Sequence, residues 1–176
     1  METDNEDINI KNDDRIESHE NFESNDMLIT AKLPNYLVEA FGDLFEEDGL
    51  LVLGRGLGIL NLMATFCRFY VDANHLQYQT VESTANEKGT KKSPLVFIIG
   101  LRDTERNYIL SVLESWGTPP HQLPTMITTE SGQGKDRAAL YSRRGIFIVT
   151  SRILIVDLLT HVASPKEIDG ILVAHA

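Results

Sequence analysis

Four short apolar runs constrain the fold of this chain more than any other feature. They are LLVL at 50–53, PLVFIIG at 94–100, GIFIVT at 145–150 and GILVAHA at 170–176. Strands that are apolar without alternation are buried on both faces, and strands separated by helices pair in parallel through right-handed crossovers. The pattern therefore predicts an α/β fold, with a mostly parallel sheet and helices on both faces.

Segments with apolar residues at helical spacing separate these runs. They predict helices within 33–48, where Pro34 occupies the first helical position, and within 59–71, 103–117 and 135–143, whereas 151–162 is helical or partly extended. TMITT at 125–129 is expected to be extended. Ligands of parallel sheets bind at the carboxyl ends of the strands, so we expect the loops after Leu53, Ile99 and Thr150 to share one edge.

Charge is distributed unevenly along the 176 residues. The formal net charge is −10, and residues 1–26 hold ten Asp and Glu against Lys11 and Arg15. Such an acidic stretch buries too little apolar surface to offset its chain entropy. We expect a disordered acidic leader over 1–27, one domain over 28–176 and a flexible loop over 80–93.

The composition excludes several classes of protein. The first residues lack the basic and apolar parts of a signal peptide, and no run of about 18 apolar residues occurs, so we expect a soluble chain that is neither exported nor bound to a membrane. The lone Cys67 allows no internal disulfide. It shares an apolar helical face with Met63 and Phe66, which favours buried packing over a reactive thiol.

Three glycines directly after the first apolar run resemble a phosphate-binding turn. They are Gly54, Gly56 and Gly58. A catalytic phosphate loop also needs a lysine for the terminal phosphates and a hydroxyl for magnesium, but Ile, Leu and Asn occupy 59–61. The glycine turn therefore lacks the residues that nucleotide hydrolysis requires.

Other interpretations of this turn remain open. The dinucleotide fingerprint needs a glycine where Ile59 stands, and Asp72 is the single match to its ribose-binding acid. In the simplest interpretation, the glycines let the chain turn sharply into a helix. In an intermediate one, the backbone and Arg55 hold a nucleic-acid phosphate without hydrolysing it.

The segment after the third apolar run predicts a phosphate contact more directly. Thr150 and Ser151 follow the strand and can cap a helix, which places hydroxyls, free N–H groups and Arg152 at its positive end. The alternative is that Arg152 pairs with a local carboxylate. GQGKDR at 132–137 is expected to be a loop that enters a helix, and the five histidines show no metal-binding spacing.

Three stretches resemble, in order and spacing, the N-terminal helicase-like domain of the XPF-type DNA repair endonucleases. They are EEDGLLVLGRGLGILNL at 46–62, PLVFIIGLRDTERNYILSVL at 94–113 and RGIFIVTSRILIVDLLTHVASPKEIDGILVAHA at 144–176. The resemblance runs from Leu33 to Ala176, apart from the 80–93 loop. It implies the first RecA-like lobe of a superfamily-two helicase, incomplete and without working ATPase motifs.

The resemblance also assigns roles to the motifs. GRGLG occupies the place of the phosphate loop, with Gly54, Gly56 and Gly58 as its degenerate remnant. Thr150, Ser151 and Arg152 fall where active helicases contact the nucleic-acid backbone. Together with Arg55, they are the expected phosphate contacts to DNA. VAHA at 173–176 falls where active helicases carry magnesium-binding acids, and it contains none.

Intact members of this family are several times longer. They add a second lobe, a magnesium-dependent nuclease domain and a C-terminal region that dimerises with a smaller endonuclease subunit. The Glu-Arg-Lys nuclease motif does not occur in this sequence. We therefore expect no catalytic residue, bound metal or cofactor in this chain, and we interpret it as a fragment, a truncated product or an incomplete gene model.

The expected function is that of the N-terminal part of a structure-specific, 3′-flap type endonuclease subunit for nucleotide excision and crosslink repair in the nucleus. Its expected partners are branched or junction DNA, the smaller subunit and repair scaffold proteins, with no ATP hydrolysis. One alternative is a protein-interaction scaffold that never contacts DNA. The near-neutral, slightly acidic charge of the domain favours weak DNA contact or scaffolding over tight DNA binding. A nucleotide-binding enzyme is the more distant alternative.

Overall fold

The computed structural model describes residues 33–81 and 93–175, apart from the side chains of 73–81. The chain divides into two units, Met1–Lys32 and Leu33–Ala176, and every described residue belongs to the second. The predicted acidic leader over 1–27 therefore lies outside the described residues. So does most of the predicted 80–93 loop, whose first two residues belong instead to a helix.

Helices and strands alternate along most of the described chain. In order they are α2 (Asn35–Glu46), α3 (Ile59–Val81), β1 (Leu95–Ile99), α4 (Asp103–Ser115), the 3-10 turn η1 (Pro120–Gln122), β2 (Thr125–Met126), α5 (Gly134–Ser142), β3 (Gly145–Ile148), α6 (Ser151–Leu159), the 3-10 turn η2 (Pro165–Glu167) and β4 (Gly170–Val173). The predicted helices are all present, and the segment after Thr150 is helical, not extended.

The four strands form one parallel sheet in the order β2-β3-β1-β4. β1 lies in the middle, where Phe97 aligns with Phe147 of β3 and with Ile171 of β4. Connections between parallel strands must cross over one face of the sheet, and here the helices make those crossings. The predicted α/β fold with a parallel sheet is confirmed.

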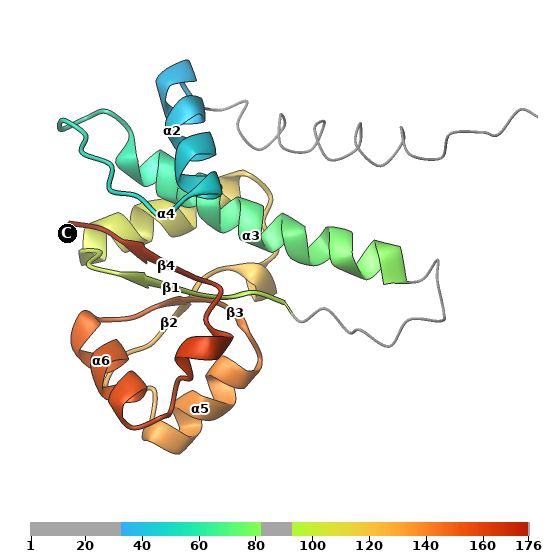
Figure 1. The fold of residues 1–176 in the computed structure, drawn as a ribbon, viewed down its shortest axis with the longest axis vertical. Coiled ribbons are helices and arrows are strands. Elements are labelled where there is room, and N and C mark those ends of the chain that lie inside the picture. The colour runs from blue at the N-terminus through green and yellow to red at the C-terminus, as the bar shows by residue number, and fades with distance from the viewer. Residues whose placement is uncertain (1–32, 82–92, 176) are drawn as a thin grey trace, which may run out of the picture. The chain divides into compact units, whose positions relative to one another are not determined.

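Helices cover both faces of the sheet, as Figure 1 shows. α3 and α4 pack against Val96 and Ile98 of β1, while α5 and α6 pack against Phe97 and Phe147 on the opposite face. α2 adds a further layer on α3 through Leu37, Phe41, Leu62 and Phe66. This layered arrangement is consistent with a RecA-like lobe.

The predicted strand at 50–53 is wrong, because these residues pair with no strand among those described. Leu51 and Leu53 pack beside Leu172 against the α2–α3 cluster, but Leu50 and Val52 are 78% and 83% exposed. A fully apolar strand needs cover on both faces, and here only one face has it. The segment is therefore a loop that leads from α2 to the glycine turn.

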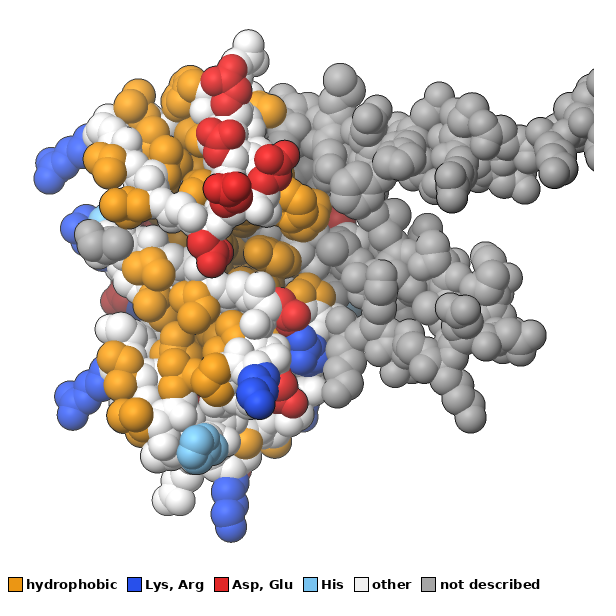
Figure 2. Space-filling model, in the orientation of Figure 1, with side chains coloured by type: hydrophobic (Ala, Val, Ile, Leu, Met, Phe, Trp, Pro, Cys, Tyr) orange, Lys and Arg blue, Asp and Glu red, His pale blue; other side chains and the backbone are white. Residues whose placement is uncertain are grey.

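An apolar surface lies over α6 and β4. Ile155 and Leu159 of α6 and Ile171 and Val173 of β4 are between 46% and 75% exposed. In Figure 2, hydrophobic side chains gather over this part of the molecule, whereas acidic side chains follow α2. Within the described ranges, no helix is both long and apolar enough to cross a membrane.

Candidate nucleic-acid interface

The carboxyl ends of the strands form the edge at which we expected a site. Val149, directly after β3, donates its N–H to the Ile98 carbonyl (3.0 Å), and Ala174, after β4, donates to the Ile99 carbonyl (2.9 Å). The strands β1, β3 and β4 therefore end at the same edge of the sheet, and Thr150 directly follows Val149 at this edge. The glycine turn before α3 lies on this side as well, although no strand precedes it (Figure 1).

Thr150 caps α6, as predicted. Its hydroxyl oxygen accepts a hydrogen bond from the Ile153 N–H (3.3 Å), and its carbonyl accepts one from the Leu154 N–H (3.0 Å). Ser151 and Arg152 lie in the exposed first turn of α6. Backbone N–H groups in the first turn of a helix have no carbonyl acceptor within that helix. The turn therefore presents two free N–H groups, the Ser151 hydroxyl and the Arg152 guanidinium at the positive end of the helix dipole.

The basic side chains in the described ranges fall into two groups. Arg68, Arg102, Arg106, Arg137 and Arg144 form ion pairs with carboxylates, whereas Arg55, Lys135, Arg143, Arg152 and Lys166 form none with any described residue. Both predicted phosphate-contacting arginines belong to the second group. The local carboxylate that we considered for Arg152 is not found among the described residues.

The glycine turn has a structural role that needs no ligand. Gly56 and Gly58 have φ values of +82° and +81°, which only glycine adopts readily. A side chain at Gly58 would also meet Leu37 of α2, 2.9 Å from its Cβ position. Asn61, at one of the positions where a phosphate loop has its catalytic polar residues, instead accepts a hydrogen bond from the Tyr108 hydroxyl (2.8 Å). The simplest interpretation, a sharp turn into α3, fits these contacts.

A histidine and a glutamate meet beside this edge. His175 Nε2 lies 2.9 Å from Oε1 of Glu105, in the first turn of α4. The pKa of Glu105 is lowered, chiefly because its carboxylate accepts a hydrogen bond from the Arg102 N–H and further because of His175. Gly100 allows the close packing between these elements, since a Cβ there would lie 2.0 Å from the Ala174 carbonyl oxygen.

A buried ionic network holds α6 against α5. Asp157 is fully buried, and its two carboxylate oxygens accept hydrogen bonds from Arg137 Nη2 (2.6 Å) and Nε (2.9 Å) and from the Tyr141 hydroxyl (2.8 Å). We did not predict this network from the sequence. Its signal is the single acid within the apolar run ILIVDLL at 153–159, since a buried charge requires a partner.

The remaining reactive residues are placed apart from this edge or used in packing. Cys67 is fully buried, and burial raises its pKa to about 12, which agrees with the predicted packing role. In the described ranges, no three His, Cys, Asp or Glu side chains gather as metal ligands. The edge therefore offers hydrogen-bond donors and the guanidiniums of Arg55 and Arg152, which form no ion pair with any described residue, and this is the chemistry of phosphate binding.

No protein-family model matches the chain. Curated relatives match most of it, however. DNA repair protein rad16 of Schizosaccharomyces pombe is 32% identical over 143 residues, and DNA repair protein RAD1 of Saccharomyces cerevisiae is 30% identical over 169. DNA repair endonuclease XPF of Dictyostelium discoideum is 28% identical over 138 residues.

These matches cover 78–86% of this chain but 13–14% of each relative, so the chain spans about one seventh of their length. They agree with the resemblance that the three apolar motifs indicated. The chain belongs to the XPF-type DNA repair endonuclease family.

Proposed function

We propose that this chain is the N-terminal part of a structure-specific DNA repair endonuclease subunit and that its lobe contacts junction DNA. The observation that carries the proposal is the first turn of α6, where Ser151 and Arg152 are both exposed and the Arg152 guanidinium forms no ion pair with any described residue. The relatives that match the chain are named as DNA repair proteins.

The proposed contact is to the DNA backbone. A phosphate oxygen would accept hydrogen bonds from the free N–H groups of Ser151 and Arg152, while the guanidinium would neutralise its charge. Thr150 would hold the turn in place through its cap. Such contacts fix the position of the protein on DNA without reading base sequence. Arg55, on the glycine turn, would add a second and weaker contact.

The lobe would bind DNA without hydrolysing ATP. Leu60 packs against the core beneath the sheet edge, and Asn61 is engaged with Tyr108, so neither position supplies the lysine or hydroxyl of a working phosphate loop. The proposed contribution of this lobe to the enzyme is therefore binding and positioning. Cleavage would belong to the magnesium-dependent nuclease domain of intact family members.

We also propose partners, repair pathways and a cellular location for the intact protein. By family resemblance, it would pair with a smaller endonuclease subunit through a C-terminal region, associate with repair scaffold proteins and act in nucleotide excision and crosslink repair in the nucleus. The exposed apolar surface of α6 and β4 gives the scaffold alternative its own support, because apolar patches on a lobe mark contacts with other protein surfaces.

The test is the affinity of the full chain for a splayed duplex–single-strand junction, measured by fluorescence anisotropy over a series of salt concentrations. We expect affinity to fall with salt, because bound phosphates release counterions. Arg152→Ala should reduce the salt slope by about one phosphate contact. Lys166→Ala is the matched control, since Lys166 is also unpaired among described residues but lies in η2, before β4 begins.

The two candidate functions give opposite results in this experiment. An affinity that does not change with salt, or equal losses for Arg152→Ala and Lys166→Ala, would remove the DNA contact and leave the scaffold function. A salt-dependent affinity that only Arg152→Ala weakens would establish the contact at α6.

A further inference from the structure

A second polar site lies at the opposite edge of the sheet, where the strands begin. It is a pocket of about 460 Å³ between Ser93, just before β1, the turn η1, the first residue of β2 and the end of α5. Its lining includes two arginines and one histidine but no Asp or Glu. In a chain of net charge −10, this pocket is suited to an anion.

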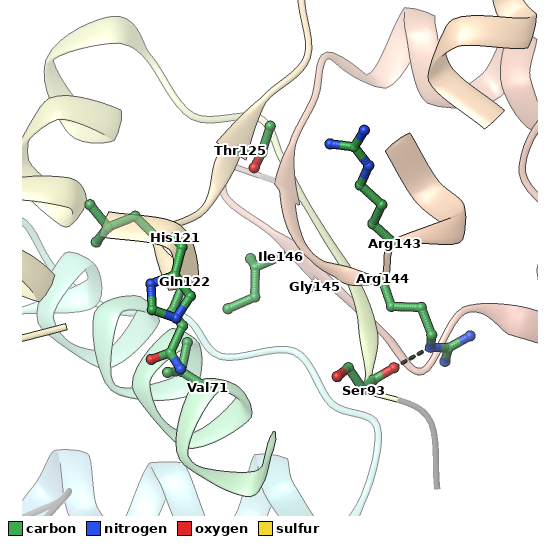
Figure 3. A pocket seen from close by; sticks show the side chains of 10 residues that line it. Val71, Ser93, His121, Gln122, Thr125, Arg143, Arg144, Gly145 and Ile146 are labelled. Carbon is green, nitrogen blue, oxygen red and sulfur yellow. Dashed lines mark hydrogen bonds between the residues drawn. The ribbon is translucent and has the colours of Figure 1, made fainter. Parts of the chain in front are cut away.

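The two arginines of the pocket have different roles. Arg144 adopts a left-handed backbone conformation (φ 60°) and binds the Ser93 carbonyl and the Asp169 carboxylate, so its charge is already compensated. The Arg143 guanidinium has no hydrogen-bond or ionic partner in the described part of the chain. Figure 3 shows Arg144 directed toward Ser93, whereas Arg143 extends to the side of the pocket where Thr125 lies.

The rest of the lining combines unpaired polar groups with apolar walls. The side chains of His121, Gln122 and Thr125 form no hydrogen bond with another described residue. Val71 and the buried Ile146 supply apolar surface, and Ile146 lies between the two polar sides in Figure 3. One part of the pocket therefore suits a charged group and another part suits a flat, weakly polar one.

We propose that this pocket binds one unpaired nucleotide. Arg143 and the Thr125 hydroxyl would hold the phosphate, the His121 ring and the apolar walls would contact the base, and the Gln122 amide would reach its edge. Splayed bases are bound in this way, by ring stacking together with hydrogen bonds to their edges. The single unpaired guanidinium matches the single charge of a phosphodiester, whereas phosphopeptide recognition uses clusters of arginines.

The proposal is independent of the DNA contact at α6, because the two sites lie at opposite ends of the strands. The nucleotide has two possible sources, a single strand of DNA or a free mononucleotide, and both present the same base and phosphate. We therefore test the full chain, labelled with ¹⁵N, against thymidine monophosphate, a short oligothymidylate and a phosphoserine peptide. The readouts are the amide signals of Thr125 and Gly145 and the affinity.

Arg143→Gln removes the proposed phosphate contact. Lys135→Gln is the matched control, because it removes an unpaired charge from the first turn of the same helix. We expect both thymidine ligands, or the oligothymidylate alone, to shift Thr125 and Gly145. Arg143→Gln should weaken that binding at least about tenfold, because it removes a charge-assisted hydrogen bond. Lys135→Gln should bind like the unchanged protein, and both variants should melt at its temperature.

Three results would overturn the proposal. The first is that neither thymidine ligand shifts the signals of Thr125 and Gly145. The second is that Arg143→Gln binds as tightly as the unchanged chain. The third is that only the phosphoserine peptide binds, which would make the pocket a protein-recognition site. Arg152→Ala should leave these signals unaffected, so failure at this pocket is distinguishable from failure at α6.

Discussion

The inner face and the first turn of α6 carry polar groups in opposite environments. On the inner face, Asp157 is completely buried, and hydrogen bonds from Arg137 and Tyr141 compensate its charge. In the first turn, Arg152 is exposed and has no ionic partner in the described ranges. Nine residues of one helix thus contain both a fully paired charge and an unpaired one.

Because of this difference, the inner face of α6 should determine the stability of the fold, and its first turn should determine ligand binding. Removing one partner of a buried ion pair leaves an uncompensated charge in the interior, which is strongly destabilising. An exposed and unpaired arginine contributes almost nothing to folding, and its charge stays available to a ligand. Substitutions on the inner face should therefore change the free energy of unfolding, and substitutions in the first turn should change affinity.

The largest expected effect is that of Asp157→Ala, which removes the fully buried carboxylate and leaves the partly buried Arg137 without its partner. We expect a loss of about 3–5 kcal/mol in the free energy of unfolding, measured by urea denaturation. Asp157→Asn keeps the shape of the side chain but removes the charge, so it should also destabilise. A loss below about 1 kcal/mol for both variants would show that the network contributes little.

Tyr141→Phe should have the second largest effect, because it removes one hydrogen bond to the Asp157 carboxylate and keeps those from Arg137. We expect a loss of about 1.5 kcal/mol. The ring packs against Phe97 and Phe147, and the Phe variant preserves those contacts. An unchanged unfolding midpoint would contradict this expectation.

The same variant should alter the alkaline pH dependence of stability. Burial, and next the hydrogen bond to Asp157, raise the pKa of Tyr141 in the folded chain. The unfolded chain therefore loses this proton first, at its ordinary pKa of about 10. Stability should be fully present below that pH and fall as the pH rises further. In Tyr141→Phe this part of the decline should disappear, which urea titrations at several alkaline pH values would detect.

Thr150→Ala removes the side-chain cap at the boundary between the two regions. We expect a loss of about 1 kcal/mol, since the Ile153 N–H loses its partner. Thr150→Ser retains the hydroxyl and should restore most of the stability. A Ser variant as unstable as the Ala variant would mean that the methyl group of Thr150, not its cap, is what stabilises the helix.

Arg152→Ala should have the smallest effect on folding, with no measurable change in melting temperature. The variant should lower only the affinity for DNA, and it should lower it equally for every base sequence, because the contact is to phosphate. Arg55→Ala should weaken the same binding less. A lower melting temperature with unchanged DNA binding would make Arg152 a structural residue and contradict the comparison.

The parts of the fold that could be predicted from sequence are those with a local signal. The apolar runs that became β1, β3 and β4 and the periodic segments that became helices each carry that signal in their own residues. The run at 50–53 has the same local signal, but it pairs with no strand in the described part of the chain and has cover on only one face, so it is a loop. Local pattern does not reveal whether a partner strand is available.

The candidate sites show the same limit. The α6 turn was predictable because Thr150, Ser151 and Arg152 are consecutive, so one helix start brings them together. The pocket of Arg143 was missed because its walls come from segments that are far apart in sequence. Only the folded sheet places the end of α5 beside η1 and β2.

The central position of β1 has a consequence for how the chain folds during synthesis. Leu95 aligns with Gly145, and Val96 aligns with Gly170, so both neighbours of β1 are made about 50 and about 75 residues later. Contacts of such long sequence separation form slowly. At translation rates of about 5–20 residues per second, the backbone of β1 would remain unpaired outside the ribosome for several seconds. A chaperone that binds extended apolar segments would find LVFII accessible throughout that interval.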